Sequence, residues 1–147
     1  IYNEHYSQTT LDRAPDFVKL AEAYGLTIRP LVEEYKNVYE TEGDNMYEVI
    51  THCTKAYTGI KGQKTMRTRY LQEDVPYSLV ALQSMGKIAG IPTPGIDAII
   101  TIGRFIIPEM DEGRTVKNLG LEGVSKEEFI KNTSRKITRF NIDKSID

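Results

Sequence analysis

RYLQEDVPYSLVALQSMGKIAGIPTPGIDAIITIG, residues 69–103, carries the strongest structural signal in the chain. It predicts a helix over about residues 75–89, which Gly90 ends, because glycine readily adopts the left-handed conformation that follows a helix. An extended Ile91–Pro94 connector follows, since residues before a proline avoid helical dihedral angles. Residues 96–107 then form a second helix that is apolar at most positions. We therefore expect this helix to be buried on most sides and to lie at the centre of the domain.

Further helices are expected upstream of this stretch. One runs to Tyr24 and ends at Gly25, and another begins with Pro30 in its first turn. Asp44 or Asn45 can cap a third, because their side chains accept hydrogen bonds from free N–H groups of a first turn. Apolar residues at spacings of three and four predict the buried face of the first of these helices: Leu11, Ala14, Val18, Ala21 and Tyr24.

The C-terminal part of the chain contains one more helix signal. Ser125 followed by Glu128 forms a capping box, which predicts a last helix to about Ile137. Residues 138–147 show only weak patterning, and we expect a mobile tail there. No segment is convincingly strand-like. The predicted fold class is therefore an all-α helical bundle, with residues 1–147 as a single domain.

The composition is ordinary for a globular domain, with 39% apolar residues, 27% charged residues and a net charge of -2. It lacks the basic excess of nucleic-acid-binding proteins, and no apolar run is long enough to predict a membrane span. The single cysteine, Cys53, excludes an internal disulfide, so we expect a reducing, cytoplasmic compartment and a core role for Cys53. The first residue is isoleucine, from which we expect a piece of a longer polypeptide or a processed chain.

The candidate site residues follow a predicted surface loop at residues 57–68. The chain has no glycine-rich nucleotide motif, and two histidines with one cysteine cannot form the usual zinc clusters. Arg69, with Arg67 two residues before it, has the side chain best suited to hold a substrate carboxylate. Asp74, at the expected head of a helix, would stay charged and could orient a histidine in proton transfer. Tyr70 could line the same pocket.

The same residues also have a purely structural interpretation. Asp74 would be an N-cap, with Pro76 in the first turn after it. Arg69 would pair with a surface acid, and Tyr70 and Tyr77 would pack with their hydroxyls at the surface. Spacing alone favours this interpretation, because caps and surface ion pairs are common.

The block from Arg69 to Gly103 resembles the C-terminal catalytic domain of the opine dehydrogenases, the octopine/nopaline dehydrogenase family. The R-Y-L-x-E-D-V-P-Y run, the P-T-P connector and the I-D-A-I-I helix stand in the family's order and spacing. The likeness begins weakly near TLDRAPDFVKLAEAYGL and continues into EGRTVKNLGLEG, residues 112–123. It therefore covers about residues 9–125.

This resemblance implies an all-α domain of the kind shared with 6-phosphogluconate dehydrogenase and related enzymes. In the family, the domain follows an N-terminal Rossmann domain that binds NAD or NADP. The whole enzyme reductively condenses an amino acid with a 2-oxo acid. The family's active-site arginine and aspartate map onto Arg69 and Asp74, and the aspartate partners a catalytic histidine.

The chain departs from the family in two respects. It lacks the nucleotide-binding half, and the flanking YNEHYS does not match the family's catalytic histidine, so His5 is not assigned that role. We therefore expect this chain alone to be inactive and to need the N-terminal Rossmann domain as its partner. An isolated domain would also expose apolar surface, from which we expect self-association into a homodimer. The alternative hypothesis is a non-catalytic helical module for dimerisation or ligand binding.

Overall fold

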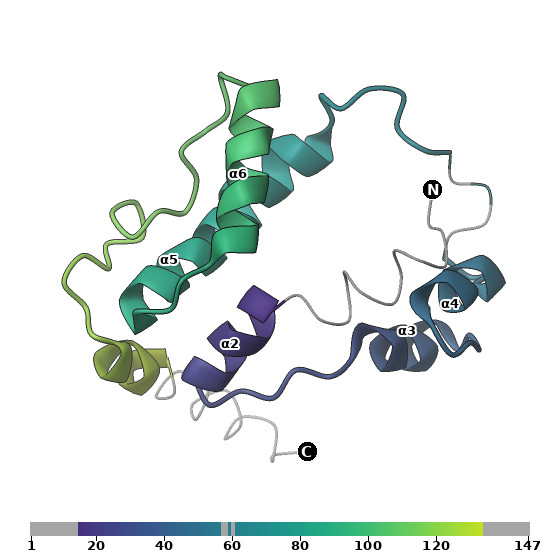
Figure 1. Ribbon diagram of the computed structural model, residues 1–147, viewed down its shortest axis with the longest axis horizontal. Coiled ribbons are helices and arrows are strands. Elements are labelled where there is room, and N and C mark those ends of the chain that lie inside the picture. Colours follow the sequence, from purple (N-terminus) through teal and green to yellow (C-terminus); the bar gives the residue numbers. More distant parts are fainter. Residues whose placement is uncertain (1–14, 57–58, 60, 134–147) are drawn as a thin grey trace, which may run out of the picture.

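The computed structural model describes residues 15–56, 59 and 61–133, and all regular structure in this part of the chain is helical (Figure 1). The all-α prediction is confirmed. A further helical stretch, residues 126–133, lies near the C-terminus. The other helices are α2 (Pro15–Ala23), α3 (Leu31–Tyr39), α4 (Met46–His52), the π-helix η1 (Tyr70–Leu79), α5 (Val80–Ala89) and α6 (Pro94–Ile106).

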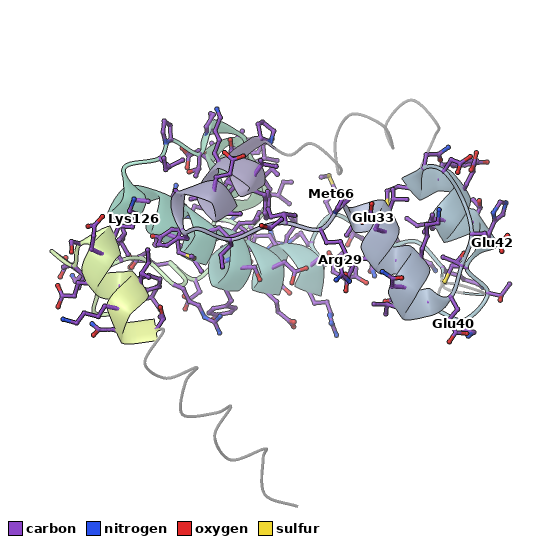
Figure 2. The ribbon with its side chains drawn as sticks, turned by 90° about the horizontal axis from the view of Figure 1, so that it is seen from below. Arg29, Glu33, Glu40, Glu42, Met66 and Lys126 are labelled. Atoms are coloured by element: carbon purple, nitrogen blue, oxygen red, sulfur yellow. The ribbon has the colours of Figure 1, made fainter. Side chains whose placement is uncertain are left out.

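The helices pack in two groups. In the larger group, α5 and α6 contact each other and each contacts both α2 and η1, whereas α3 packs on α4. Figure 2 shows Lys126 at one end of the molecule and Glu40 and Glu42, from the α3–α4 group, at the other. The larger group has a core of aliphatic side chains, each of which stabilises the fold by about 1.5–3 kcal/mol when fully buried. These side chains are Leu20, Val75, Val80, Ile96 and Ile100.

Several helix ends lie where the sequence predicts them. Gly25 and Gly90 follow α2 and α5 with φ of 69° and 68°, a left-handed conformation that glycine adopts without strain. Asn45 caps α4, because its Oδ1 accepts a hydrogen bond from the N–H of Glu48 at 3.0 Å. Ser125 caps the last helix in the same way, accepting from the N–H of Glu128 at 3.2 Å. The predicted extension to Ile137 and the tail at 138–147 lie outside the described residues.

The α3–α4 group has a small core of its own. Met46, Val49 and Cys53 are buried there, which confirms the core role expected for Cys53. Pro30 precedes α3 as its N-cap residue, one position earlier than predicted. None of the α3 residues is fully buried, so this group rests mainly on the α4 side chains.

The predicted buried face of α2 is right for Tyr24, which is buried, and wrong for Val18, which is exposed. Its buried side chains are Asp16 and Leu20, with Tyr24 just after the helix, whereas Val18 is 39% exposed. Leu20 packs into the core, and buried Asp16 accepts a hydrogen bond from α6. A buried carboxylate needs such a partner, and apolar periodicity cannot reveal it. Leu11 and Ala14 lie outside the described residues.

Asp74 is not a helix N-cap, which corrects the predicted start of the helix at residue 75. The chain turns helical at Arg69, and the N–H of Gln72 already donates to the carbonyl of Thr68 at 3.1 Å. Asp74 and Pro76 therefore lie inside η1. Pro76 is tolerated there because η1 is a π-helix and not an α-helix.

The prediction that α6 is buried on most sides is also wrong for the described part of the chain. Ile96, Ile100 and Gly103 are buried. In contrast, Ile99, Ile102 and Phe105 are 47%, 56% and 86% exposed, and we call these three residues the outer face of α6. The reason is that α2, α5 and η1, the helices that contact α6, lie on its buried side.

Candidate active site

The candidate site is built on η1, a π-helix with Pro76 inside it. In a π-helix an N–H donates to the carbonyl five residues earlier, and the N–H of Val80 does so to Val75. In an α-helix, the ring of Pro76 would clash with the carbonyl four residues earlier, that of Gln72. The wider turn of a π-helix relieves this clash. Pro76 is therefore a local reason for the unusual helix.

The π-helical turn determines how Arg69 and Asp74 are related. In an α-helix, at about 100° per residue, two residues five apart would point about 140° away from each other. In a π-helix the hydrogen bond spans five residues and each turn is wider, so the angle between residues five apart is much smaller than in an α-helix. Arg69 and Asp74 are five apart, and Arg69 immediately precedes η1. The π-helical register therefore brings the starting directions of the two side chains closer together than an α-helix would.

Arg69 is exposed and only weakly held. Its Nε lies 3.9 Å from Oε2 of Glu73, with the two side chains 74% and 59% exposed. Its guanidinium carbon lies 5.9 Å from the centroid of the Tyr70 ring. The structural interpretation is thus right that Arg69 pairs with a surface acid. An exposed pair at this spacing contributes only about 0.3–0.5 kcal/mol, so the guanidinium stays available to another carboxylate. Asp74 is exposed as well.

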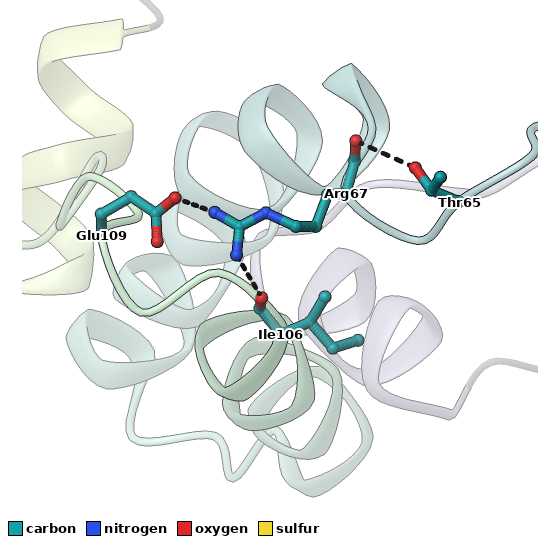
Figure 3. Close-up of polar contacts among 4 residues, drawn as sticks. All are labelled: Thr65, Arg67, Ile106 and Glu109. Carbon is teal, nitrogen blue, oxygen red and sulfur yellow. Dashed lines mark hydrogen bonds and ion pairs between the residues drawn. The ribbon is translucent and has the colours of Figure 1, made fainter.

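Arg67 is engaged by the end of α6 (Figure 3). Its guanidinium donates to the carbonyl of Ile106 at 3.3 Å and pairs with the carboxylate of Glu109. The hydroxyl of Thr65 donates to the carbonyl of Arg67 at 3.4 Å, within the loop that precedes η1. A substrate carboxylate at Arg67 would therefore share or displace Glu109, whereas the ion-pair partner of Arg69 among the described residues is the more distant Glu73.

The two tyrosines of η1 have different surroundings. Tyr70 is 52% exposed and lies beside the Arg69 guanidinium. Tyr77 is 41% exposed, and the Arg114 guanidinium lies 6.0 Å from the centroid of its ring. Tyr70 therefore flanks the candidate site, and Tyr77 faces the segment that follows α6.

The described histidine lies in the other helix group. Nδ1 of His52 is 3.1 Å from the carbonyl oxygen of Glu42, in the connection between α3 and α4. His5 lies outside the described residues. Within the described ranges, no cluster of three or more histidine, cysteine or acidic side chains could hold a metal ion. In the described part of the chain, His52 and Asp74 therefore lie in different helix groups.

Two contacts of the site were not expected from the sequence. Glu109 pairs with Arg67, which lies 42 positions earlier in the chain. The backbone N–H of Arg114 donates to the carbonyl oxygen of Pro76 in η1. The only local signal was Gly113 among charged neighbours, which indicates a turn but not what the turn packs against.

These features define an all-α domain with an exposed arginine immediately before a proline-containing π-helix and an exposed aspartate within that helix. The chain belongs to the NAD/NADP octopine/nopaline dehydrogenase family, whose α-helical domain it matches over residues 3–107. The resemblance noted in the sequence is thereby confirmed. Its extension into residues 112–123 lies beyond the matched range and stays a prediction.

Three curated enzymes are similar to the chain. It is 36% identical over 110 residues to the opine dehydrogenase of Arthrobacter sp. (strain 1C), covering 74% of this chain and 30% of that enzyme. It is 40% identical over 57 residues to the opine dehydrogenase of Haliotis discus hannai, covering 39% of this chain and 14% of that enzyme. For the tauropine dehydrogenase of Arabella iricolor, identity is 42% over 55 residues, covering 37% and 14%. The chain thus spans less than a third of the length of these relatives.

None of the helices in the described ranges has the length and apolar character needed to cross a membrane.

Proposed function

We propose that this chain is the substrate-binding domain of an opine-type dehydrogenase, which condenses an amino acid with a 2-oxo acid and oxidises NADH or NADPH. The single observation that carries the proposal is that Arg69 and Asp74 are both exposed, immediately before and within η1, in a chain whose family is that of octopine/nopaline dehydrogenases. We place the enzyme in the cytoplasm. The nicotinamide cofactor, bound mainly by a separate N-terminal Rossmann domain, supplies the hydride.

In this proposal Arg69 binds the carboxylate of a substrate. Hydrogen bonds to charged groups contribute about 1.5–3 kcal/mol, and a guanidinium can offer two in parallel to one carboxylate. The exposed pair with Glu73 contributes only about 0.3–0.5 kcal/mol. A substrate carboxylate therefore displaces Glu73 readily. Tyr70 flanks the bound carboxylate, and Arg67 supplies a second positive charge nearby.

Asp74 acts in proton transfer without itself giving up a proton. A carboxylate on η1 can accept the N–H of an imidazole and stabilise its charged form. The histidine would come from the rest of the polypeptide, so the described domain alone is expected to be inactive. Arg69 and Asp74 together would hold the acid group of the substrate beside the site of proton transfer.

A second candidate function rests on the outer face of α6. Ile99, Ile102 and Phe105 form an exposed apolar stripe, which is typical of a surface that another protein covers. The chain would then be a non-catalytic helical module for dimerisation or ligand binding that retains the family's fold.

The test is made in a polypeptide that joins this chain to a nucleotide-binding domain. NADH or NADPH should be oxidised only when both an amino acid and a 2-oxo acid are present, and Arg69→Ala should abolish this. Arg29→Ala is the matched control, because Arg29 is also an exposed arginine paired with an acid, Glu34, at 3.0 Å. Full activity of Arg69→Ala would refute the assigned carboxylate contact. No turnover by the unaltered two-domain protein would favour the non-catalytic module.

A further inference from the structure

Residues 107–114, here called the α6 exit segment, leave α6 and return across η1 and α5. The N–H of Arg114 donates to the carbonyl oxygen of Pro76 at 2.9 Å. The carbonyl of Arg114 accepts a hydrogen bond from the hydroxyl of Ser84 at 3.0 Å, and Ser84 is 1% exposed. The backbone of Arg114 is therefore fastened to η1 on one side and to α5 on the other.

The approach of this segment to η1 requires glycine at position 113. Gly113 has a φ of 77°, and a Cβ built on it would overlap the carbonyl of Pro76. Its N–H donates to Oδ1 of Asp111 at 2.6 Å, and its carbonyl accepts from Nδ2 of Asn118 at 2.8 Å. These two side chains hold Gly113 in the conformation that lets the segment touch the helix.

The hydrogen bond from Arg114 to Pro76 affects which type of helix η1 forms. In an α-helix, the N–H of Val80 would donate to the carbonyl of Pro76, four residues earlier. In η1 the N–H of Val80 donates to Val75 instead. The N–H of Arg114 supplies Pro76 with the donor that the α-helical register would have provided. Because the carbonyl of Pro76 already has this donor, it does not need the α-helical hydrogen bond from Val80, and the π-helical register of η1 is favoured.

We infer that Gly113 and Arg114 are positioning residues, whose backbone holds η1 in the π-helical register and so brings the starting directions of Arg69 and Asp74 closer together. The same segment also meets the other end of the site, since Glu109 pairs with Arg67. The effect on the register stands on geometry alone. Its consequence for substrate binding rests on the proposed function.

A pair of glycine substitutions separates this role from general strain. Gly113 and Gly123 have nearly equal φ values, 77° and 76°, but a Cβ on Gly123 meets nothing within 4 Å. Alanine therefore costs similar backbone strain at both positions, and only Gly113→Ala collides with Pro76. In NMR spectra of the chain, Gly113→Ala should shift the backbone signals of residues 70–76, and Gly123→Ala should leave them in place. Equal shifts in both variants, or none in Gly113→Ala, would overturn the inference.

The functional consequence is measured in the two-domain polypeptide with pyruvate as the 2-oxo acid. Gly113→Ala should raise the KM for pyruvate by about tenfold or more, because small displacements of a binding group are costly, and leave the KM for the nucleotide unchanged. A smaller amount of folded enzyme would lower apparent kcat without raising that KM, and this result would contradict a positioning role. If the unaltered protein shows no such reaction, the proposed function fails, and the NMR comparison still decides the inference about the register.

A milder substitution covers the case in which Gly113→Ala does not fold. Asn118→Ala removes only the side-chain donor to the carbonyl of Gly113. The signals of residues 70–76 should shift in the same direction and by a smaller amount. Unchanged signals in folded Asn118→Ala would count against the inference.

Discussion

Oδ2 of Asp16 accepts a hydrogen bond from the backbone N–H of Ile96 at 3.0 Å, although the two residues are 80 positions apart in the chain. Asp16 is 4% exposed and lies at the N-terminal turn of α6, where N–H groups lack acceptors within the helix. Thr93, the N-cap residue of α6, makes no side-chain cap bond. A side chain of α2 therefore caps α6 and joins the two helices.

Removal of this cap should destabilise the domain measurably. We expect Asp16→Ala to lower the free energy of unfolding by about 1–2 kcal/mol, as for other lost N-caps. Asp16→Asn keeps an acceptor oxygen, so it should lower the free energy of unfolding by less than Asp16→Ala does. Urea denaturation of the chain measures both, with Glu22→Ala on the exposed side of α2 as the control. An Asp16→Ala midpoint equal to that of Glu22→Ala would contradict the role of the cap.

Arg67 and Arg69 should contribute unequally to substrate binding. Arg67 is already paired with Glu109 and bonded to the carbonyl of Ile106, whereas the described ion pair of Arg69, with Glu73, is longer, at 3.9 Å. We expect Arg67→Ala to raise the KM for the 2-oxo acid only by about fivefold or less, in line with the small energies of exposed ion pairs. Steady-state kinetics of the two-domain polypeptide provides the measurement. A larger loss for Arg67→Ala than for Arg69→Ala would reverse the assignment.

The outer face of α6 should drive self-association of the isolated chain. We expect sedimentation velocity to show a dimer that forms as the concentration rises, because apolar stripes of this kind are usually covered. Replacing Ile102 and Phe105 by serine should leave a monomer. Leu26→Ser is the control, since Leu26 is 61% exposed and lies outside this face. A wild-type chain that stays monomeric at all concentrations would refute this prediction, as would an equal effect of Leu26→Ser.

Tyr24 should make stability depend on alkaline pH. Burial raises the pKa of its hydroxyl above the usual 10.0, and this hydroxyl donates to the carbonyl of Met85 at 2.8 Å. The folded state therefore holds the proton more tightly than the unfolded state. The protonated Tyr24 hydroxyl therefore contributes to the free energy of unfolding. This contribution is complete below about pH 10, the usual tyrosine pKa, and is lost as the pH rises through the pKa of Tyr24 in the folded state.

The measurement compares wild type with Tyr24→Phe in urea across this pH range. The variant should be less stable by about 0.5–1.5 kcal/mol at neutral pH, the usual contribution of one hydrogen bond, and the difference should shrink above pH 10. Tyr77→Phe serves as the control, because Tyr77 is 41% exposed. A wild-type advantage that grows with pH would show that the sign is wrong.

Much of the local structure could be predicted because it depends on neighbouring residues. Gly25, Gly90, Asn45 and Ser125 mark helix ends where expected, since a cap or a left-handed residue acts within one turn. Arg69 and Asp74 could be selected as candidates from residue type and family resemblance. The start of η1 could not be predicted, because the usual capping rules made Asp74 and Pro76 look like the beginning of an α-helix.

By itself, the sequence determined the helical class and most helix ends, and it supplied Arg69 and Asp74 as candidate site residues. The tertiary structure decided that Asp16 caps α6, that the outer face of α6 is exposed among the described residues, and that η1 has a π-helical register. The physical reason is the range of the interactions. A cap or turn is set by residues within a few positions, whereas the donor to Pro76 comes from Arg114, on the segment that follows α6.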